Sequence, residues 1–187
     1  YESSTASDFS ANLTTISGTG SSITVSGLTQ TMYYRAVVIS GPCTTYSTTA
    51  TVTVNPATVG GTVSGGQAVC TGTNSTVLTL SGQRGSVVKW QYSTSSTFAT
   101  VTDTAVTATS LTAMNLTATT YYRAVVTSGV CSSATSNVAT ITVDPASVGG
   151  TVSGSDTVCT GTNSTQLILG SHTGNVVKWQ WSTTGDF

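Results

Sequence analysis

The stretch "VVKWQYST" at residues 87–94 alternates apolar and polar side chains, and it recurs as "VVKWQWST" at residues 176–183. Val88, Trp90 and Tyr92 fall on one face of such a strand, because successive side chains of a strand point to opposite sides. Trp90 is the kind of large aromatic residue that a β-sandwich places in its core. The stretch therefore predicts a buried strand that the chain uses twice.

Longer segments around this strand are repeated as well, at a shift of 88 or 89 residues. The repeated segments are "VCTGTNST" (69–76 and 158–165), "YYRAVV" (33–38 and 121–126) and "PATVGGTVSG" (56–65), which returns as "PASVGGTVSG" (145–154). A fixed period of this kind indicates tandem copies of one structural unit.

This register divides the chain into three parts. They are the C-terminal part of one repeat (1–56), one complete repeat (57–145) and the N-terminal part of a third (146–187). Three phenylalanines then occupy equivalent positions: Phe9, Phe98 and Phe187. Neither end of the chain coincides with a repeat boundary, so we expect the chain to be a window on a longer array.

The complete repeat consists of short runs rich in Val, Thr, Ile and Tyr, separated by Gly, Ser and Asn, with no helical period. These runs predict a split first strand at 62–65 and 67–71, followed by strands at 76–82, 86–93, 98–102, 109–115, 119–128 and 137–144. Seven strands in about 89 residues is the number found in an immunoglobulin-like sandwich. We therefore expect an all-β chain of tandem immunoglobulin-like β-sandwich repeats.

A pair of tyrosines lies in the strand expected at 119–128. Leu116 and Tyr122 have the spacing of a tyrosine corner, which would fix the connection into this strand. Alternation turns Tyr122 inward and Tyr121 outward, where cross-strand packing is the ordinary role and contact with a polysaccharide is the alternative. Tyr33 is the equivalent residue in the first repeat, so Tyr33 and Tyr121 are the candidate glycan contacts.

Four cysteines in a chain with few charges are typical of an exported protein with disulfides. The periodicity leaves two arrangements open: Cys70 with Cys131 inside the complete repeat, or Cys43 with Cys70 and Cys131 with Cys159 across the junctions. We favour the first, on the expectation that the second half of the first strand runs beside the last strand and so approaches Cys131. Cys43 and Cys159 would then pair with parts of repeats outside this chain.

Composition excludes several classes of function. Charged residues make up 6% of the chain, against about a quarter in typical soluble proteins. Five scattered basic residues and a net charge of -1 provide no footprint for nucleic acid, and the apolar runs are too short for membrane insertion. The acids are isolated and His172 is the one histidine, so we expect no catalytic residue, metal site or cofactor.

Two kinds of glycosylation signal are present. Asn-X-Ser/Thr triplets begin at Asn12, Asn74, Asn115 and Asn163. The triplets "DTA" at 103–105 and "DTV" at 156–158 resemble the acceptor that Bacteroidetes use for O-linked glycans on exported proteins, which makes Thr104 and Thr157 candidates. A chain this rich in Ser and Thr also produces such triplets by chance, so both interpretations stay open.

The combined pattern of "VCTGTNST", "VVKWQYST", "TTYYRAVVTSGVCSSATSN" and "TITVDPA" resembles the immunoglobulin-like repeats of giant Bacteroidetes cell-surface and secreted adhesins. Gliding-motility adhesins of the SprB kind are among them. The resemblance covers the whole chain, although Tyr1 stands where the other repeats have Trp. It implies an extracellular, surface-anchored location, type IX export, and the export and anchoring machinery as partners.

This resemblance and the repeats predict a non-enzymatic stalk or filament segment whose main partners are the neighbouring repeats of the same polypeptide. An accessory carbohydrate-binding module that contacts surface polysaccharide is the alternative. Pro56 and Pro145 are expected to end the last strand of one repeat. The glycine pairs that begin at Gly60 and Gly149 would then be tight bends and not flexible tethers, so that the angle between repeats is itself repeated.

Overall fold

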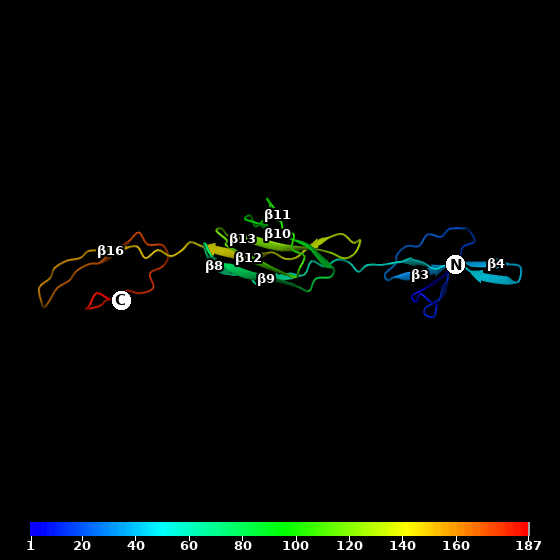
Figure 1. Cartoon of the computed structure of the whole chain (residues 1–187), viewed down its shortest axis with the longest axis horizontal. Coiled ribbons are helices and arrows are strands. Elements are labelled where there is room, and N and C mark those ends of the chain that lie inside the picture. The colour runs from blue at the N-terminus through cyan, green and yellow to red at the C-terminus, as the bar shows by residue number, and fades with distance from the viewer. Residues whose placement is uncertain (187) are drawn as a thin grey trace.

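The computed structural model describes residues 1–186, a range that contains strands and no helix, and hence no helix that could cross a membrane. Phe187, which the sequence aligns with Phe9 and Phe98, lies outside the described residues. Figure 1 shows three parts strung along the long axis of the molecule and joined by extended segments. The middle part is a complete β-sandwich, which confirms the predicted fold class.

One layer of the middle repeat is a three-stranded antiparallel sheet. In it β9 (Ser75–Ser81) lies between β7 (Thr62–Ser64) and β12 (Ser110–Met114). Burial alternates along β9, with Leu78 and Leu80 inside at 0% and 3% exposure. A strand that alternates in this way buries one face only, so the sheet turns its apolar side toward the second layer.

The second layer has the strand order β11–β10–β13–β15–β8, with β14 paired to the end of β13. Its strands are β8 (Ala68–Cys70), β10 (Ser86–Ser93), β11 (Thr102–Asp103), β13 (Thr120–Thr127), β14 (Ala134–Thr135) and β15 (Ala139–Asp144). Neighbours are antiparallel except β8 and β15, which run parallel. The first strand of the repeat is thus divided between the two layers, as the sequence predicts.

A cluster of twelve buried side chains fills the space between the two layers. Trp90 is its largest member, fully buried, and its indole Nε1 donates a hydrogen bond to the carbonyl oxygen of Ala108 at 2.9 Å. Leu78 and Ile141 are also fully buried. All twelve residues lie between Val63 and Ile141, so the middle repeat holds a complete core of its own and has what it needs to fold as a unit.

Two strands differ from the sequence prediction. A β-bulge between Val87 and Lys89 turns Val87 inward, at 7% exposure, and leaves Val88 at 49%. The extra residue of a bulge breaks the alternation, which is why Val88 does not share the core face with Trp90. The strand expected at 98–102 is reduced to the short β11, which pairs with β10 in the same layer.

The two outer parts each repeat a portion of this sandwich. The first part contains a sheet of β2 (Thr14–Thr15), β1 (Glu2–Ser4), β3 (Met32–Arg35) and β6 (Ala50–Val52), and a hairpin of β4 (Val37–Ser40) and β5 (Cys43–Tyr46). Its order β2–β1–β3–β6 matches β11–β10–β13–β15. The third part pairs β16 (Thr151–Ser153) with β17 (Ile168–Gly170), in the register that joins β7 to β9.

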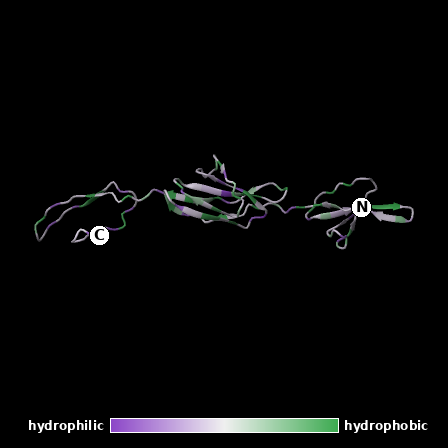
Figure 2. Cartoon of the chain, in the orientation of Figure 1, coloured by the Kyte–Doolittle hydropathy of each residue, from purple (hydrophilic) through white to green (hydrophobic). Residues whose placement is uncertain are grey.

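Core positions are exposed in both outer parts. Trp179, the equivalent of Trp90, is 54% exposed, and Val38, the equivalent of the fully buried Val126, is 52% exposed. Figure 2 accordingly shows β4, the strand that contains Val38, as strongly hydrophobic. The counterparts of β7 and β9 for the first part, and of β12, β13 and β15 for the third part, do not fall within residues 1–187. The exposed apolar faces are therefore parts of incomplete sandwich cores.

Candidate functional site

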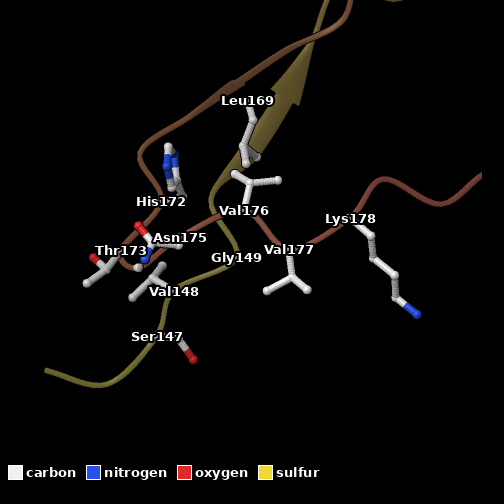
Figure 3. A pocket seen from close by; sticks show the side chains of 11 residues that line it. Ser147, Val148, Gly149, Leu169, His172, Thr173, Asn175, Val176, Val177 and Lys178 are labelled. Carbon is white, nitrogen blue, oxygen red and sulfur yellow. The ribbon is translucent and has the colours of Figure 1, made fainter. Parts of the chain in front are cut away.

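The hollow shown in Figure 3 is the inner face of the third part, lined by Leu169, His172 and Val176 among others. Leu169 and Val176 take the positions of Leu80 and Val87, which are 3% and 7% exposed in the middle repeat. A complete sandwich fills this space with its own side chains. The hollow is therefore an open core and not a ligand site.

Groups that could carry catalysis are dispersed over the chain. His172 is exposed and takes the position of Gln83 in the middle repeat, so no activity common to the repeats can depend on it. Within residues 1–186, no group of three or more His, Cys, Asp or Glu side chains lies close enough to hold a metal ion. The features that the repeats do share are structural, and they lie on the outer sheet face, at the loops and at the junction.

The candidate glycan contacts Tyr33 and Tyr121 occupy equivalent positions in β3 and β13, and both are half-buried. Tyr121 lies in register with Ser93 of β10 and with Thr140 of β15. Its neighbour Tyr122 points inward and is 5% exposed, as predicted. The positions agree with cross-strand packing on the outer face, and polysaccharide binding there stays a prediction.

An arginine–phenylalanine stack that sequence reasoning missed is repeated on this outer face. The guanidinium of Arg123 lies 4.1 Å from the ring centroid of Phe98, and that of Arg35 lies 4.1 Å from the centroid of Phe9. Both phenylalanines have a positive φ, 54° and 60°, which is uncommon for this residue type. Each arginine guanidinium thus makes a cation–π contact with a phenylalanine of its own repeat. The one sequence signal for this stack is that both repeats carry an equivalent phenylalanine and an equivalent arginine.

Asn74 is engaged in the fold and is not a free glycan acceptor. Its Nδ2 donates hydrogen bonds to the carbonyl oxygens of Cys70 at 2.9 Å and Leu116 at 2.8 Å, and its Oδ1 accepts one from the N–H of Leu116 at 2.9 Å. In the third part Asn163 repeats the bond to Cys159, at 3.0 Å. A glycan on Nδ2 would disrupt these contacts, so the structure argues against N-glycosylation at Asn74.

We expect Asn74→Asp to lower the free energy of unfolding of the middle repeat by about 2–3 kcal/mol, at roughly 1 kcal/mol for each hydrogen bond lost. The carboxylate keeps an acceptor for the N–H of Leu116 but loses the donors to the carbonyl oxygens of Cys70, Gly72 and Leu116. Denaturant unfolding followed by circular dichroism measures the change. Asn115→Asp is the matched control, because Asn115 is exposed at φ 54°, a conformation that both residue types tolerate. Equal losses in the two variants would contradict the role of Asn74.

The other glycosylation candidates are accessible. Thr104 is half-buried, and the exposed candidates are Asn12, Asn115, Asn163 and Thr157. Thr104 follows Asp103, whose carboxylate accepts hydrogen bonds from Lys89 at 2.6 Å and from Gln91 at 2.9 Å. The Lys89 hydrogen bond is the main cause of a lowered pKa of Asp103. The ion pair of Asp103 with Lys89 joins β11 to β10 beside Thr104. Use of the five sites stays a prediction.

The four cysteines are free thiols, and the predicted bond between Cys70 and Cys131 is wrong. The strand β8 does run beside β15, but in parallel, so that Cys70 lies opposite Asp144 at the end of β15. Cys131 follows the opposite end of β13. The 8 residues of β13 separate the two ends, about 24 Å at ~3.4 Å per residue, whereas a disulfide needs Cα atoms within about 7 Å.

The second arrangement, Cys43 with Cys70 and Cys131 with Cys159, is not formed either. Cys43 begins β5, whose hairpin points away from the middle repeat, while Cys70 lies in β8 at the far end of that repeat (Figure 1). Cys159 follows β16 on the long loop that leads to β17 and extends away from the middle repeat (Figure 1). Both proposed pairs therefore join distant ends of neighbouring parts.

The segment that leads into the middle repeat is docked onto it. Val59 and Arg84 exchange backbone hydrogen bonds of 3.1 and 3.0 Å. The hydroxyl of Thr58 accepts a hydrogen bond from the N–H of Ser128 at 3.0 Å. At the second junction Val148 and Thr173 exchange the equivalent backbone bonds, of 3.1 and 3.0 Å. The linking segment thus belongs to the sandwich that follows it.

The glycine pair of the first junction is a fixed bend. Gly60 is buried, and a Cβ there would lie 1.9 Å from the carbonyl oxygen of Thr135. Gly61 has a φ of +77°, and Gly150 in the second junction has a φ of +74°, the left-handed region that favours glycine. The bend that the sequence predicts is therefore present, and its dihedral angle is repeated.

The end of the first repeat contacts the loop between β13 and β14. The thiol of Cys131 lies 3.6 Å from the carbonyl oxygen of Asn55 and 3.5 Å from that of Pro56. The side chain of Asn55 packs on Gly129, where an added Cβ would lie 2.2 Å from its Nδ2. This loop is the surface on which the preceding repeat ends. The junction, from Asn55 to Gly61, is the candidate functional site.

A family model for a domain of unknown function, DUF8696, matches the chain three times, at residues 1–56, 59–145 and 148–187. The chain belongs to this family. Two of the three DUF8696 matches begin at Val59 and Val148, the residues that form the equivalent backbone pairs at the two junctions. No curated protein matches the chain.

Proposed function

We propose that this chain is a structural stalk or filament segment of a large repetitive cell-surface adhesin, which extends the protein from the cell for attachment or gliding. The observation that carries the proposal is the docked junction. The last residues of one DUF8696 unit contact the β13–β14 loop of the next, and the linking segment hydrogen-bonds to the body of that unit. Units held in this way add length in a fixed direction.

The surface of the chain suits such a role outside the cell. Five Lys and Arg residues in 187 offer few sites to trypsin-like proteases. The edge strands carry few charges, so glycans on the exposed Thr and Asn candidates, or neighbouring repeats, would protect them from lateral pairing. Export and anchoring by type IX machinery enter the proposal through the resemblance to adhesin repeats. The proposed role is structural and requires no catalysis.

Small-angle scattering on proteins with one, two and four copies of residues 57–145 tests the proposal. Each copy contains the complete core, and we expect the maximum dimension to grow by about 40 Å per copy, from strand length plus turns. A chain with free junctions would grow more slowly, as a flexible linker does, and this result would contradict a stalk. Glycan binding by a single copy, lost in Tyr121→Ala, would favour the carbohydrate-binding module instead.

A further inference from the structure

We propose that successive repeats are joined by a disulfide between Cys70 of one repeat and the residue at the position of Cys131 in the next repeat. This pairing differs from both arrangements that the sequence allowed. It follows from two contacts, one at each end of the middle repeat, that involve equivalent residues of the chain.

The first contact lies at the junction that precedes the middle repeat. There the thiol of Cys131 approaches the carbonyl oxygens of Asn55 and Pro56, at 3.6 and 3.5 Å. Cys131 is half-buried in this contact. The side chain of the cysteine in the β13–β14 loop thus faces the last two residues of the preceding repeat.

The second contact lies at the other end of the middle repeat, where Asp144 and Pro145 are the equivalents of Asn55 and Pro56. Cys70 lies in register with Asp144, on the adjacent strand of a parallel pair, and strands of a sheet lie about 4.8 Å apart. The N–H of Thr71 donates to the carbonyl oxygen of Asp144 at 2.8 Å. Cys70 is exposed there.

Because Asn55 and Asp144 are equivalent residues, the two contacts place the two cysteines at the same point of a junction. In one junction the carbonyl oxygen at the Asn55 position is approached by the cysteine of the following repeat. In the other, the equivalent oxygen of Asp144 is held by the residue that directly follows Cys70. Both cysteines therefore border the same carbonyl oxygen, on which the two repeats meet, and this proximity is what a disulfide requires.

This pairing also accounts for the four free thiols. The partner position of each cysteine lies in an adjacent repeat, and none of these positions falls within residues 1–187. When the bond forms, each thiol gives up a proton and the pair gives up two electrons to an exchanging disulfide oxidant, which is reduced to two thiols. Every internal repeat of an array would then be cross-linked to both neighbours.

The disulfide would fix the junction of the proposed stalk. It rests on the proposed function only because both require repeats in tandem. Two copies of residues 57–145, joined from Pro145 to Ala57, reproduce the Pro–Ala step of the natural junction. In one variant, Cys131→Ser in the first copy and Cys70→Ser in the second leave the proposed pair. The matched control exchanges the two substitutions between the copies and leaves two distant cysteines.

Both variants are equilibrated with reduced and oxidised glutathione, alkylated and weighed intact. We expect the first to be lighter by two hydrogens and to take up no alkylating reagent, and the control to take up two equivalents. Alkylation of both thiols in the first variant would overturn the proposal. Disulfide formation in a single copy of 57–145, which would join Cys70 to Cys131 within one repeat, would also overturn it.

The 187-residue chain provides a second measurement that needs no substitution. Under the same conditions we expect all four of its cysteines to be alkylated, and a disulfide between any two of them within one molecule would contradict the pairing. Scattering separates this proposal from the stalk. Rod-like growth with free thiols would refute the cross-link alone, whereas a formed disulfide with slow growth would refute the stalk alone.

Discussion

Trp90→Ala is expected to lower the free energy of unfolding of the middle repeat by about 3–5 kcal/mol, the range for truncating a buried Trp. Trp90 is fully buried among the side chains of both layers, and its indole donates a hydrogen bond to Ala108. The substitution leaves a cavity that the surrounding strands cannot close. Denaturant unfolding of residues 57–145, followed by far-ultraviolet circular dichroism, measures the loss without relying on Trp fluorescence.

Two variants separate core packing from other effects of the substitution. Trp179→Ala, made in the 187-residue chain and compared there with Trp90→Ala, is the same change at the equivalent position of the third part, where the side chain is 54% exposed. We expect it to leave the unfolding of the middle repeat unchanged. Trp90→Phe retains much of the packing and removes the indole hydrogen bond, so its cost should fall between the two. A small loss in Trp90→Ala would mean that the sandwich is not closed around this residue.

The strands of the middle repeat could be predicted because each alternates in polarity and because the chain presents its pattern more than once. The predicted strand at 76–82 is β9, and that at 119–128 contains β13. The prediction failed at the strand expected at 98–102, which is reduced to β11 (Thr102–Asp103), and where the backbone leaves the regular pleat. The bulge at Val87 reverses the side of Val88, and no residue type in "SVVK" marks a bulge.

The candidate site was less accessible to sequence reasoning, because it depends on direction and on contacts between distant segments. The pairing of β8 with β15 was expected, yet the disulfide depended on which end of β15 lies next to Cys70. A parallel pair places Cys70 beside Asp144, at the end of the repeat far from Cys131. Likewise Asn74 carries a glycosylation signal, whereas its side chain binds Leu116, 42 residues away.

Gly60→Ala is expected to lower the free energy of unfolding of the middle repeat by about 3 kcal/mol, the upper end of what overpacking costs. The added methyl would lie 1.9 Å from the carbonyl oxygen of Thr135, a backbone atom of β14 that cannot turn aside as a flexible side chain can. Alternatively, the linking segment could move away from the sandwich to make room for the methyl group. It would then lose the bonds of Val59 to Arg84 and of Thr58 to Ser128.

Gly149→Ala is the matched control within the same chain. Gly149 holds the equivalent position in the second junction, but an added Cβ there meets nothing within 4 Å, so we expect a change below about 0.5 kcal/mol. Thermal unfolding of both variants of the 187-residue chain compares them directly. Equal stabilities would show that the first junction is not docked in solution, and the stalk proposal would lose the observation that supports it.

The same comparison can be turned into a test of the repeat itself. An added Cβ at Gly149 meets nothing because β14, which packs on Gly60, has no counterpart in residues 146–187. In a protein of two copies of 57–145, Gly60 of the second copy takes the place of Gly149 and faces a complete sandwich. We expect alanine there to cost as much as Gly60→Ala does here, and to slow the growth in length that scattering measures. A substitution that is harmless beside a partial repeat and costly beside a complete one would mean that each junction is set by the repeat that follows it.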